Sequence, residues 1–255
     1  MSSKPTIFII FYSIYGHVYT LAKEIQSGLE SKGVNVKLYQ IPETLSEEIL
    51  QKIHAPPRRD IPDITVDELE KADGIIWGLP TRFGLADSST KAFFDSTGGL
   101  WASGALAGKP TSVFFSTAGQ HGGQESTVFN TITYFAHHGM IYVPLGFANP
   151  HMFDNSEVVG SSAWGAGTVA HGDGSRQVSD KEKAIAKTQA ENFANFVLTM
   201  QKGKNLLQQQ QQQQEEKINN NNNSTTTTAP VTPSKTPTKQ EKEDKHKGVS
   251  KCFCM

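Results

Sequence analysis

Wholly apolar or alternating runs of residues recur along residues 1–202 of this 255-residue chain. Short runs of this kind are typical of β-strands. Between them, apolar residues recur three or four positions apart, as at Leu21, Ile25 and Leu29, which predicts amphipathic helices. Strands are expected at 6–12, 34–39, 74–78, 111–115 and 140–144, and helices at 19–31, 66–71, 88–96, 124–138 and 179–200, with a helix and an irregular excursion at 42–62.

Strands that alternate with helices indicate a parallel sheet with helices on both faces, because a parallel connection needs a crossover of helical length. The fold class is therefore α/β, and five strands favour the doubly wound, flavodoxin-like order 2-1-3-4-5. Ligands bind such sheets beyond the carboxyl ends of the strands, where the strand order reverses. We expect a site at the loops after the first, third and fourth strands.

The last helix and the segment after it differ sharply in composition. Ser179 is expected to cap the helix, with Glu182 at the capping-box position. Beyond residue 202 come seven glutamines (208–214), five asparagines (219–223) and four threonines (225–228), which cannot bury enough apolar surface to offset chain entropy. The sequence predicts a domain over 1–202 and a disordered tail over 203–255, or alternatively a helix that continues for a few turns through the glutamines.

Charge and cysteine content narrow the function classes. Residues 1–202 carry 16 Lys and Arg against 20 Asp and Glu, and residues 203–255 carry 8 against 5, so no basic face for nucleic acid is expected. No run of 18 apolar residues and no signal-peptide pattern is found. Since the only cysteines are Cys252 and Cys254, a cytoplasmic protein is expected, with neither a disulfide nor a thiolate metal site in the domain.

The three loops carry side chains suited to a phosphorylated planar ligand. The first, at 13–18, opens a helix whose N-terminal N–H groups favour an anion, with Gly16 allowing close approach. It lacks both the Walker lysine pattern and GxGxxG, which favours a retained monophosphate. The second loop offers Thr81, Arg82 and Phe83 to a flat ring. The alternative for the first loop is an ordinary strand-to-helix turn with a polar cap. The alternative for Arg82 is a surface arginine or a salt bridge between subunits.

Three further features each have a structural alternative to a role in binding. Trp101 lies in a glycine-rich turn at 98–104, where it either faces a ligand or packs in the core. His137 and His138 end a predicted helix, where histidine is often a C-terminal cap. His121 either contacts the cofactor or faces solvent. No His, Asp or Glu spacing predicts a metal site.

Several stretches make the chain resemble the WrbA family of flavodoxin-like NAD(P)H:quinone oxidoreductases. They are Tyr12-Ser-Ile-Tyr-Gly-His17, Pro80-Thr-Arg-Phe-Gly84, Thr97-Gly-Gly-Leu-Trp-Ala-Ser-Gly-Ala-Leu106, Gly122-Gly-Gln-Glu125, Ala136-His-His-Gly-Met140 and Gly172-Asp-Gly-Ser-Arg176. The similarity covers about residues 5–200. It implies a homotetrameric FMN enzyme that takes a hydride from NADH or NADPH and passes two electrons to a quinone by a ping-pong mechanism, in defence against oxidative stress.

The resemblance also implies roles for individual residues. Tyr15 and Trp101 would bind the substrates, and Trp101 and His137 would close the site, partly across a subunit interface. The third loop departs from the bacterial form of the family: it is one residue longer and has Ala118 where glycine is common. The FMN ligands implied are Ser13, Ile14, Tyr15, Gly16, His17, Val18, Thr81, Arg82, Phe83, Ser116, Thr117, Ala118, Gly119, Gln120, His121, Gly122 and His137.

The sequence is also compatible with two functions other than quinone reduction. One is a one-electron carrier, although carriers of this fold are usually strongly acidic and this domain has a formal charge of only −4 (16 basic against 20 acidic residues). The other is a membrane-associated scaffold with little turnover. A redox titration separates the first from a quinone reductase, and steady-state NADH oxidation with a quinone separates the second.

The chain ends in Cys252-Phe-Cys-Met255, which has the C-a-a-X form with the terminal Met of the farnesyl pattern. Cys254 replaces an aliphatic residue, so the match is imperfect. A farnesyl group on Cys252, helped by Lys245, Lys247 and Lys251, would hold part of the protein on the cytoplasmic face of a membrane, with the plasma membrane favoured. The alternative is a flexible terminus that happens to contain cysteines.

Overall fold

A computed structural model describes residues 4–223 of the chain, with side chains through residue 218. Its strands and helices alternate as the hydrophobic pattern predicts. The elements are β1 (Thr6–Phe11), α1 (His17–Ser31), β2 (Asn35–Gln40), α2 (Glu47–Lys52), α3 (Val66–Leu69), β3 (Gly74–Arg82), β4 (Leu85–Ala86), α4 (Ser88–Asp95), α5 (Gly98–Ser103), β5 (Pro110–Thr117), α6 (Ser126–His137), β6 (Ile141–Tyr142), the 3₁₀-helix η1 (Pro150–Phe153), β7 (Gly167–Val169) and α7 (Asp180–Asn223).

The sheet has the doubly wound order β2-β1-β3-β5-β6, and these neighbouring strands are all parallel. Counting only these five strands along the chain gives 2-1-3-4-5, so the predicted flavodoxin-like fold is confirmed. Two short strands were not predicted: β4 pairs antiparallel with β3, and β7 pairs parallel with the end of β5. The carboxyl ends of β1, β3 and β5 meet at one edge of the sheet.

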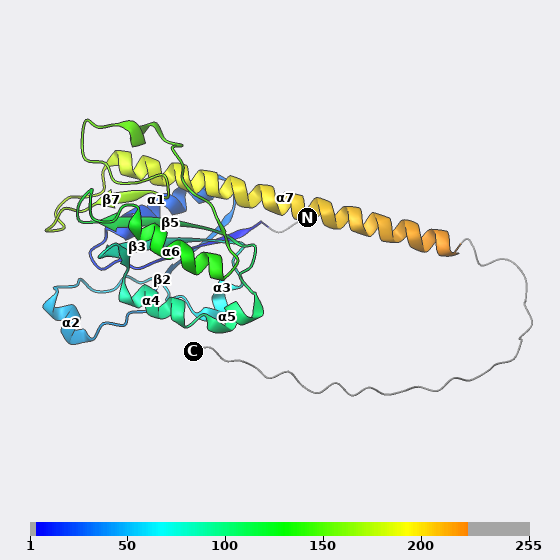
Figure 1. The fold of residues 1–255 in the computed structure, drawn as a ribbon, viewed down its shortest axis with the longest axis horizontal. Coiled ribbons are helices and arrows are strands. Elements are labelled where there is room, and N and C mark those ends of the chain that lie inside the picture. Colours follow the sequence, from blue (N-terminus) through cyan, green and yellow to red (C-terminus); the bar gives the residue numbers. More distant parts are fainter. Residues whose placement is uncertain (1–3, 224–255) are drawn as a thin grey trace, which may run out of the picture. The chain divides into compact units, whose positions relative to one another are not determined.

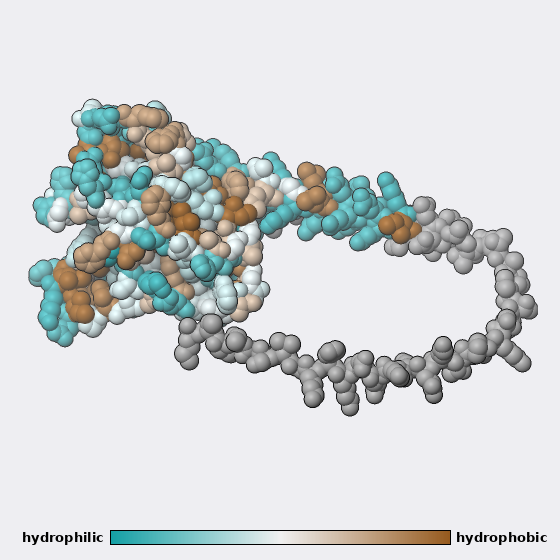
Figure 2. All heavy atoms as spheres, in the orientation of Figure 1, coloured by the Kyte–Doolittle hydropathy of each residue, from teal (hydrophilic) through white to brown (hydrophobic). Residues whose placement is uncertain are grey.

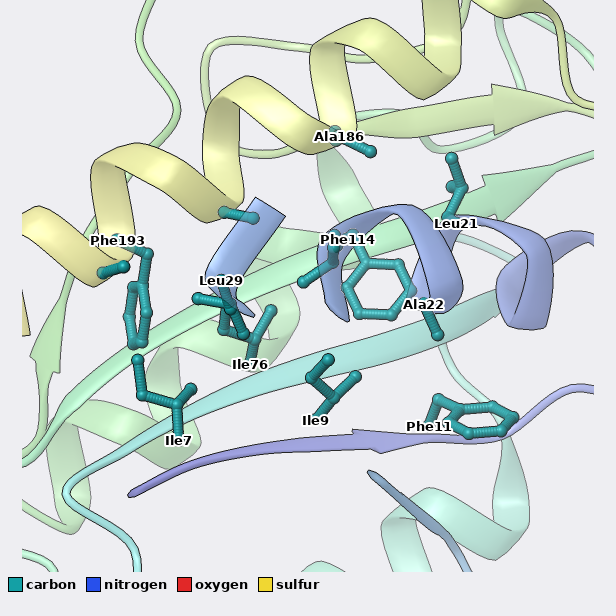
Figure 3. Packing of buried hydrophobic residues seen from close by; sticks show 14 of the residues in the cluster. Ile7, Ile9, Phe11, Leu21, Ala22, Leu29, Ile76, Phe114, Ala186 and Phe193 are labelled. Atoms are coloured by element: carbon teal, nitrogen blue, oxygen red, sulfur yellow. The ribbon is translucent and has the colours of Figure 1, made fainter. Parts of the chain in front are cut away.

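Helices cover both faces of the sheet (Figure 1). On one face, alternate residues of β1 pack against α1 and the first half of α7, and Figure 3 shows Ile7, Ile9 and Phe11 pointing toward these helices. On the other face, Phe8 and Ile10 pack with residues of α3, α4, α5 and α6. Burial of both faces explains why the central strands read as nearly continuous apolar runs.

The glycine-rich segment expected as a turn is instead the short helix α5. Leu100, Trp101 and Ala102 are compatible with helical backbone, and Gly104 ends the helix at φ +68°, the left-handed conformation that glycine adopts without strain. Trp101 is 60% exposed, so its interpretation as a core residue is excluded.

The capping box predicted at the start of α7 is confirmed. The Ser179 hydroxyl accepts from the Glu182 N–H at 3.2 Å, and the Glu182 carboxylate accepts from the Ser179 N–H at 2.8 Å. The helix then continues to Asn223 instead of ending near Met200, because glutamine and glutamate keep good helix propensity without burial.

The chain divides into two units, Met1–Leu207 and Gln208–Met255. Within the described part of the second unit, side chains 208–218 are all exposed. No helix among residues 4–223 combines the length and the apolar character needed to cross a membrane.

Candidate functional site

A cleft of ≈ 620 Å³ opens at the carboxyl ends of β1, β3, β5 and β7. All three loops predicted from the sequence contribute to it, together with a fourth loop that follows β7. The lining residues are 13–18, 80–83, 116–118, 122 and 170–174. The structure therefore brings together, from three separate loops, most of the residues expected to bind a cofactor.

The first loop presents a helix N-terminus to the cleft. Gly16 is the N-cap of α1 at φ +102° and brings no capping side chain of its own, and the first turn of α1 holds no acidic residue. The Ser13 hydroxyl accepts from the Tyr19 N–H at 3.3 Å, and the Thr20 hydroxyl donates to the Gly16 carbonyl at 3.1 Å. The first N–H groups of a helix have no intrahelical acceptor, so this end of α1 can hold an anion.

The second loop is a tight hairpin between β3 and β4. Thr81 and Arg82 pair with Ala86 and Leu85, which leaves Phe83 and Gly84 as the turn. Phe83 has φ +54° and is fully exposed, a conformation that costs a bulky residue about 1–3 kcal/mol. This turn presents the Phe83 ring to the cleft, where Phe83 is one of the lining residues.

Hydroxyl and amide groups fix the second and third loops against each other and against β7. Thr127 donates its hydroxyl to the Thr81 hydroxyl at 2.7 Å. Buried Gln124 donates through Nε2 to the Thr117 hydroxyl at 2.5 Å and to the Thr168 carbonyl at 3.3 Å, while its Oε1 accepts from the Ser161 N–H at 2.6 Å. These bonds orient a set of neutral donors and acceptors along the cleft.

The fourth loop, residues 170–174, was not assigned to the site from the sequence. Its glycines, Gly172 and Gly174, were the available signal, but the three-residue strand β7 before it is too short to stand out. Asp173 is the one carboxylate in this loop, and hydrogen bonds from the Ser175 N–H and hydroxyl lower its pKa. The carboxylate is thus directed into its own turn.

A buried ion pair anchors this fourth loop. Arg176 Nη1 donates to both oxygens of Glu182 at 2.9 and 3.0 Å, and Glu182 is fully buried. The Arg176 carbonyl lies 2.8 Å from Nε2 of His17, the first residue of α1. The start of α7, the fourth loop and the first loop are therefore linked by direct hydrogen bonds.

Five residues predicted for the site do not line this cleft: Trp101, Gly119, Gln120, His121 and His137. Trp101 lies on α5, and His137 ends α6 with its Nδ1 2.7 Å from the Thr133 carbonyl. His138 is the C-cap of α6, and burial lowers its pKa. Gly119, Gln120 and His121 lie farther along the third loop.

The donor set of the cleft fits FMN. The anion end is a helix N-terminus without an acidic residue, and the walls carry hydroxyls, one arginine and aromatic or aliphatic groups. Among residues 4–218, no group of three or more His, Cys, Asp or Glu side chains could hold a metal ion. The cleft suits an organic anion with a planar ring.

Comparison with known proteins agrees with this chemistry. The family model described as NADPH-dependent FMN reductase matches residues 7–154. A quinone-oxidoreductase of Triphysaria versicolor is 58% identical over 178 residues, which cover 69% of this chain and 87% of that protein. An NAD(P)H quinone oxidoreductase of Candida albicans is 51% identical over 191 residues, which cover 75% of this chain and 95% of that protein.

A solved structure supports the fold. The flavodoxin, WrbA-like protein from Agrobacterium tumefaciens superposes with a TM-score of 0.54 at 21% identity, covering 77% of this chain and 99% of that one. With the two relatives above, this agrees with the sequence-based assignment to flavodoxin-like NAD(P)H quinone oxidoreductases. The chain belongs to the NADPH-dependent FMN reductase family.

Proposed function

We propose that the protein is an FMN-dependent NAD(P)H:quinone oxidoreductase that reduces quinones by two electrons, in defence against oxidative stress. When bound, FMN accepts a hydride from NADH or NADPH and passes two electrons on to the quinone. The observation that carries the proposal is that loops following β1, β3 and β5 line one cleft with neutral donors around a helix N-terminus. The protein's part is to bind and orient the cofactor and both substrates.

Within the cleft, each loop has its own role in this proposal. Residues 13–18 hold the phosphate on the N-terminus of α1, and Thr81 and Thr117 orient the ring and its chain. Arg82 is exposed beside the cleft, where its charge favours electron density on the pyrimidine edge. Tyr15 lines the cleft, and its hydroxyl is fixed to the Ile53 carbonyl at 2.9 Å, so it can support the nicotinamide donor.

A homotetramer is part of the proposal, because Trp101 and His137 are exposed and lie outside the cleft of their own chain. They would close the cleft of a second subunit. Apolar side chains gather at several separate places on the face seen in Figure 2, as expected for a subunit with more than one contact. The large exposed aromatic residues are Tyr15, Phe83, Trp101, Phe129, Phe147 and Phe153.

Steady-state kinetics of the purified full-length protein test the mechanism. If NAD(P)H and quinone use the same open cleft in turn, double-reciprocal plots against benzoquinone or menadione give parallel lines. Flavin released by acid should be FMN and not FAD, since the site has one helix N-terminus for one phosphate. Intersecting lines would contradict the ping-pong order, and a lack of NADH oxidation would contradict the function.

Trp101→Ala is expected to lower quinone reduction at least about tenfold while FMN content stays near stoichiometric, because a wall of the substrate site is lost and the phosphate loop is intact. Turnover and flavin content are measured on the same preparation. Leu206→Ala on α7, which also truncates an exposed apolar side chain, is the matched control and should leave both unchanged. Equal loss of turnover and FMN would mark Trp101 as structural.

The C-terminal motif lies outside the described residues, and we propose that farnesylation of Cys252 places part of the protein on the cytoplasmic face of a membrane, near lipid quinones. One lipid chain anchors weakly, so the lysines before it would add affinity for an anionic surface. The Cys252→Ser variant is expected to leave the membrane fraction of cells. Cys254→Ser keeps the lipidated position and should remain in the membrane fraction. Identical distributions of the wild type, Cys252→Ser and Cys254→Ser would contradict the anchor.

A further inference from the structure

Arg59 reaches the back of the first loop from the segment between α2 and α3. Its Nη1 donates to the Ser13 carbonyl at 3.0 Å, and its guanidinium lies over the Tyr19 ring at 4.5 Å. Its Nη2 is 3.2 Å from the position that a Cβ on Gly16 would occupy. Arg59 thus lies against Ser13, Gly16 and Tyr19, in the first loop and the first turn of α1.

This guanidinium has no acidic partner in the part of the chain that the structure describes, since no carboxylate oxygen there lies within 4.0 Å. Glu43 and Glu47 both line the same ≈ 320 Å³ cavity as Arg59, but neither pairs with it. The two Glu43 oxygens accept from the Tyr12 hydroxyl at 3.0 and 2.9 Å, and Glu47 Oε1 accepts from Gln51 Nε2 at 3.5 Å. The neighbouring Arg58, in contrast, pairs with Asp63 at 2.5 Å.

A partly buried cation without a counter-ion is unfavourable, because it loses hydration and gains no charge partner. Burial indeed lowers the pKa of Arg59, although an arginine remains charged at neutral pH. The first turn of α1 contains no acid, and Ser13 and Ile14 line both the cleft and the cavity of Arg59. An anion bound at the loop is therefore the partner that the arrangement lacks.

We propose that Arg59 is a positioning residue that fixes the Ser13 carbonyl and supplies the positive charge by which the loop prefers a phosphorylated flavin to an unphosphorylated one. The phosphate would contact the N–H groups and hydroxyls of the loop, and Arg59 would act from behind them. The inference rests on FMN binding alone and is independent of the quinone kinetics.

Equilibrium titration of the full-length protein, stripped of flavin, separates this role from simple support of the loop. For Arg59→Gln, we expect the Kd for FMN to rise at least about tenfold, since a charge pair at low effective dielectric is lost. The Kd for riboflavin should change by less than about twofold, because riboflavin carries no phosphate. The FMN affinity of the variant should also depend less on salt than that of the wild type.

Two further variants complete the test. Arg59→Lys keeps the charge and should retain most of the preference for FMN over riboflavin. If Arg59→Gln does not fold, the Kd values of Arg59→Lys for FMN and riboflavin are compared with those of the wild type instead. Arg58→Gln removes an equal charge from the adjacent residue, one that is already paired with Asp63, and it should leave both Kd values unchanged. Equal weakening of FMN and riboflavin in the Arg59 variants, unchanged binding, or an equal effect of Arg58→Gln would overturn the proposal.

Discussion

Glu182→Gln is expected to lower the free energy of unfolding by about 3–5 kcal/mol, because it leaves the largely buried Arg176 guanidinium, 15% exposed, without its counter-charge. For a domain of this size, that corresponds to a fall in Tm of about 10 °C. An amide offers one acceptor oxygen where the carboxylate offers two. The donors that converge on Glu182 are the N–H groups of Gly160, Val169 and Ser179, the Thr168 hydroxyl and Arg176 Nη1.

Thermal unfolding of the flavin-free protein measures this effect without a contribution from ligand. Asp180→Asn is the matched control: its carboxylate is 98% exposed and pairs with Lys183 at 3.0 Å, so its removal should change stability by less than about 0.5 kcal/mol. Because Arg176 also carries the carbonyl that contacts His17, Glu182→Gln should weaken FMN binding as well. A Tm equal to that of Asp180→Asn would contradict the anchoring role.

The sheet and most helices could be predicted from the sequence because their signals are local. The apolar runs of β1, β3 and β5 and the spacing of Leu21, Ile25 and Leu29 report burial directly. The capping box of Ser179 and Glu182 depends on residues three positions apart. Since the carboxyl ends of parallel strands share an edge, the first three loops of the site followed from the strand order alone.

The parts that were missed depend on contacts between distant residues. Arg59 lies 46 positions from Ser13, and no periodicity indicates that the α2–α3 segment folds back onto the first loop. The fourth loop depends on β7, which has three residues and exists because it pairs with the end of β5. For Trp101, the sequence suggested a ligand site or a core position, whereas in a single chain its side chain faces outward.

Glu182 is a helix-capping residue that is also fully buried, because it accepts hydrogen bonds from outside the cap. A capping-box glutamate usually serves two N–H groups at a helix end. Here the same carboxylate also accepts from the Val169 N–H in β7 and from Arg176. One carboxylate therefore caps α7 and anchors the segment that contains the fourth loop. The sequence predicted the capping contact with Ser179. The contacts with β7 and Arg176 could not be predicted without knowing that the start of α7 lies beside β7.

Gly165→Ala is expected to destabilise the domain, because a Cβ at this position would lie 2.1 Å from the Val113 carbonyl oxygen in β5. A backbone atom cannot rotate away, so β5 or the turn before β7 must move. Overpacking of this kind costs about 1–3 kcal/mol, and more where backbone is displaced. Since Ser116 and Thr117 follow on the same strand and line the cleft, FMN affinity should fall together with Tm.

The same substitution at Gly203 is the matched control and should have the opposite sign. Gly203 lies inside α7, its φ is not positive, and a Cβ there would meet nothing within 4 Å. Glycine in a helix costs about 0.5–1 kcal/mol relative to alanine, so Gly203→Ala should raise Tm slightly and leave FMN affinity unchanged. Thermal unfolding and FMN titration of both variants decide the matter: equal Tm shifts would mean that contact with Val113 does not constrain β5.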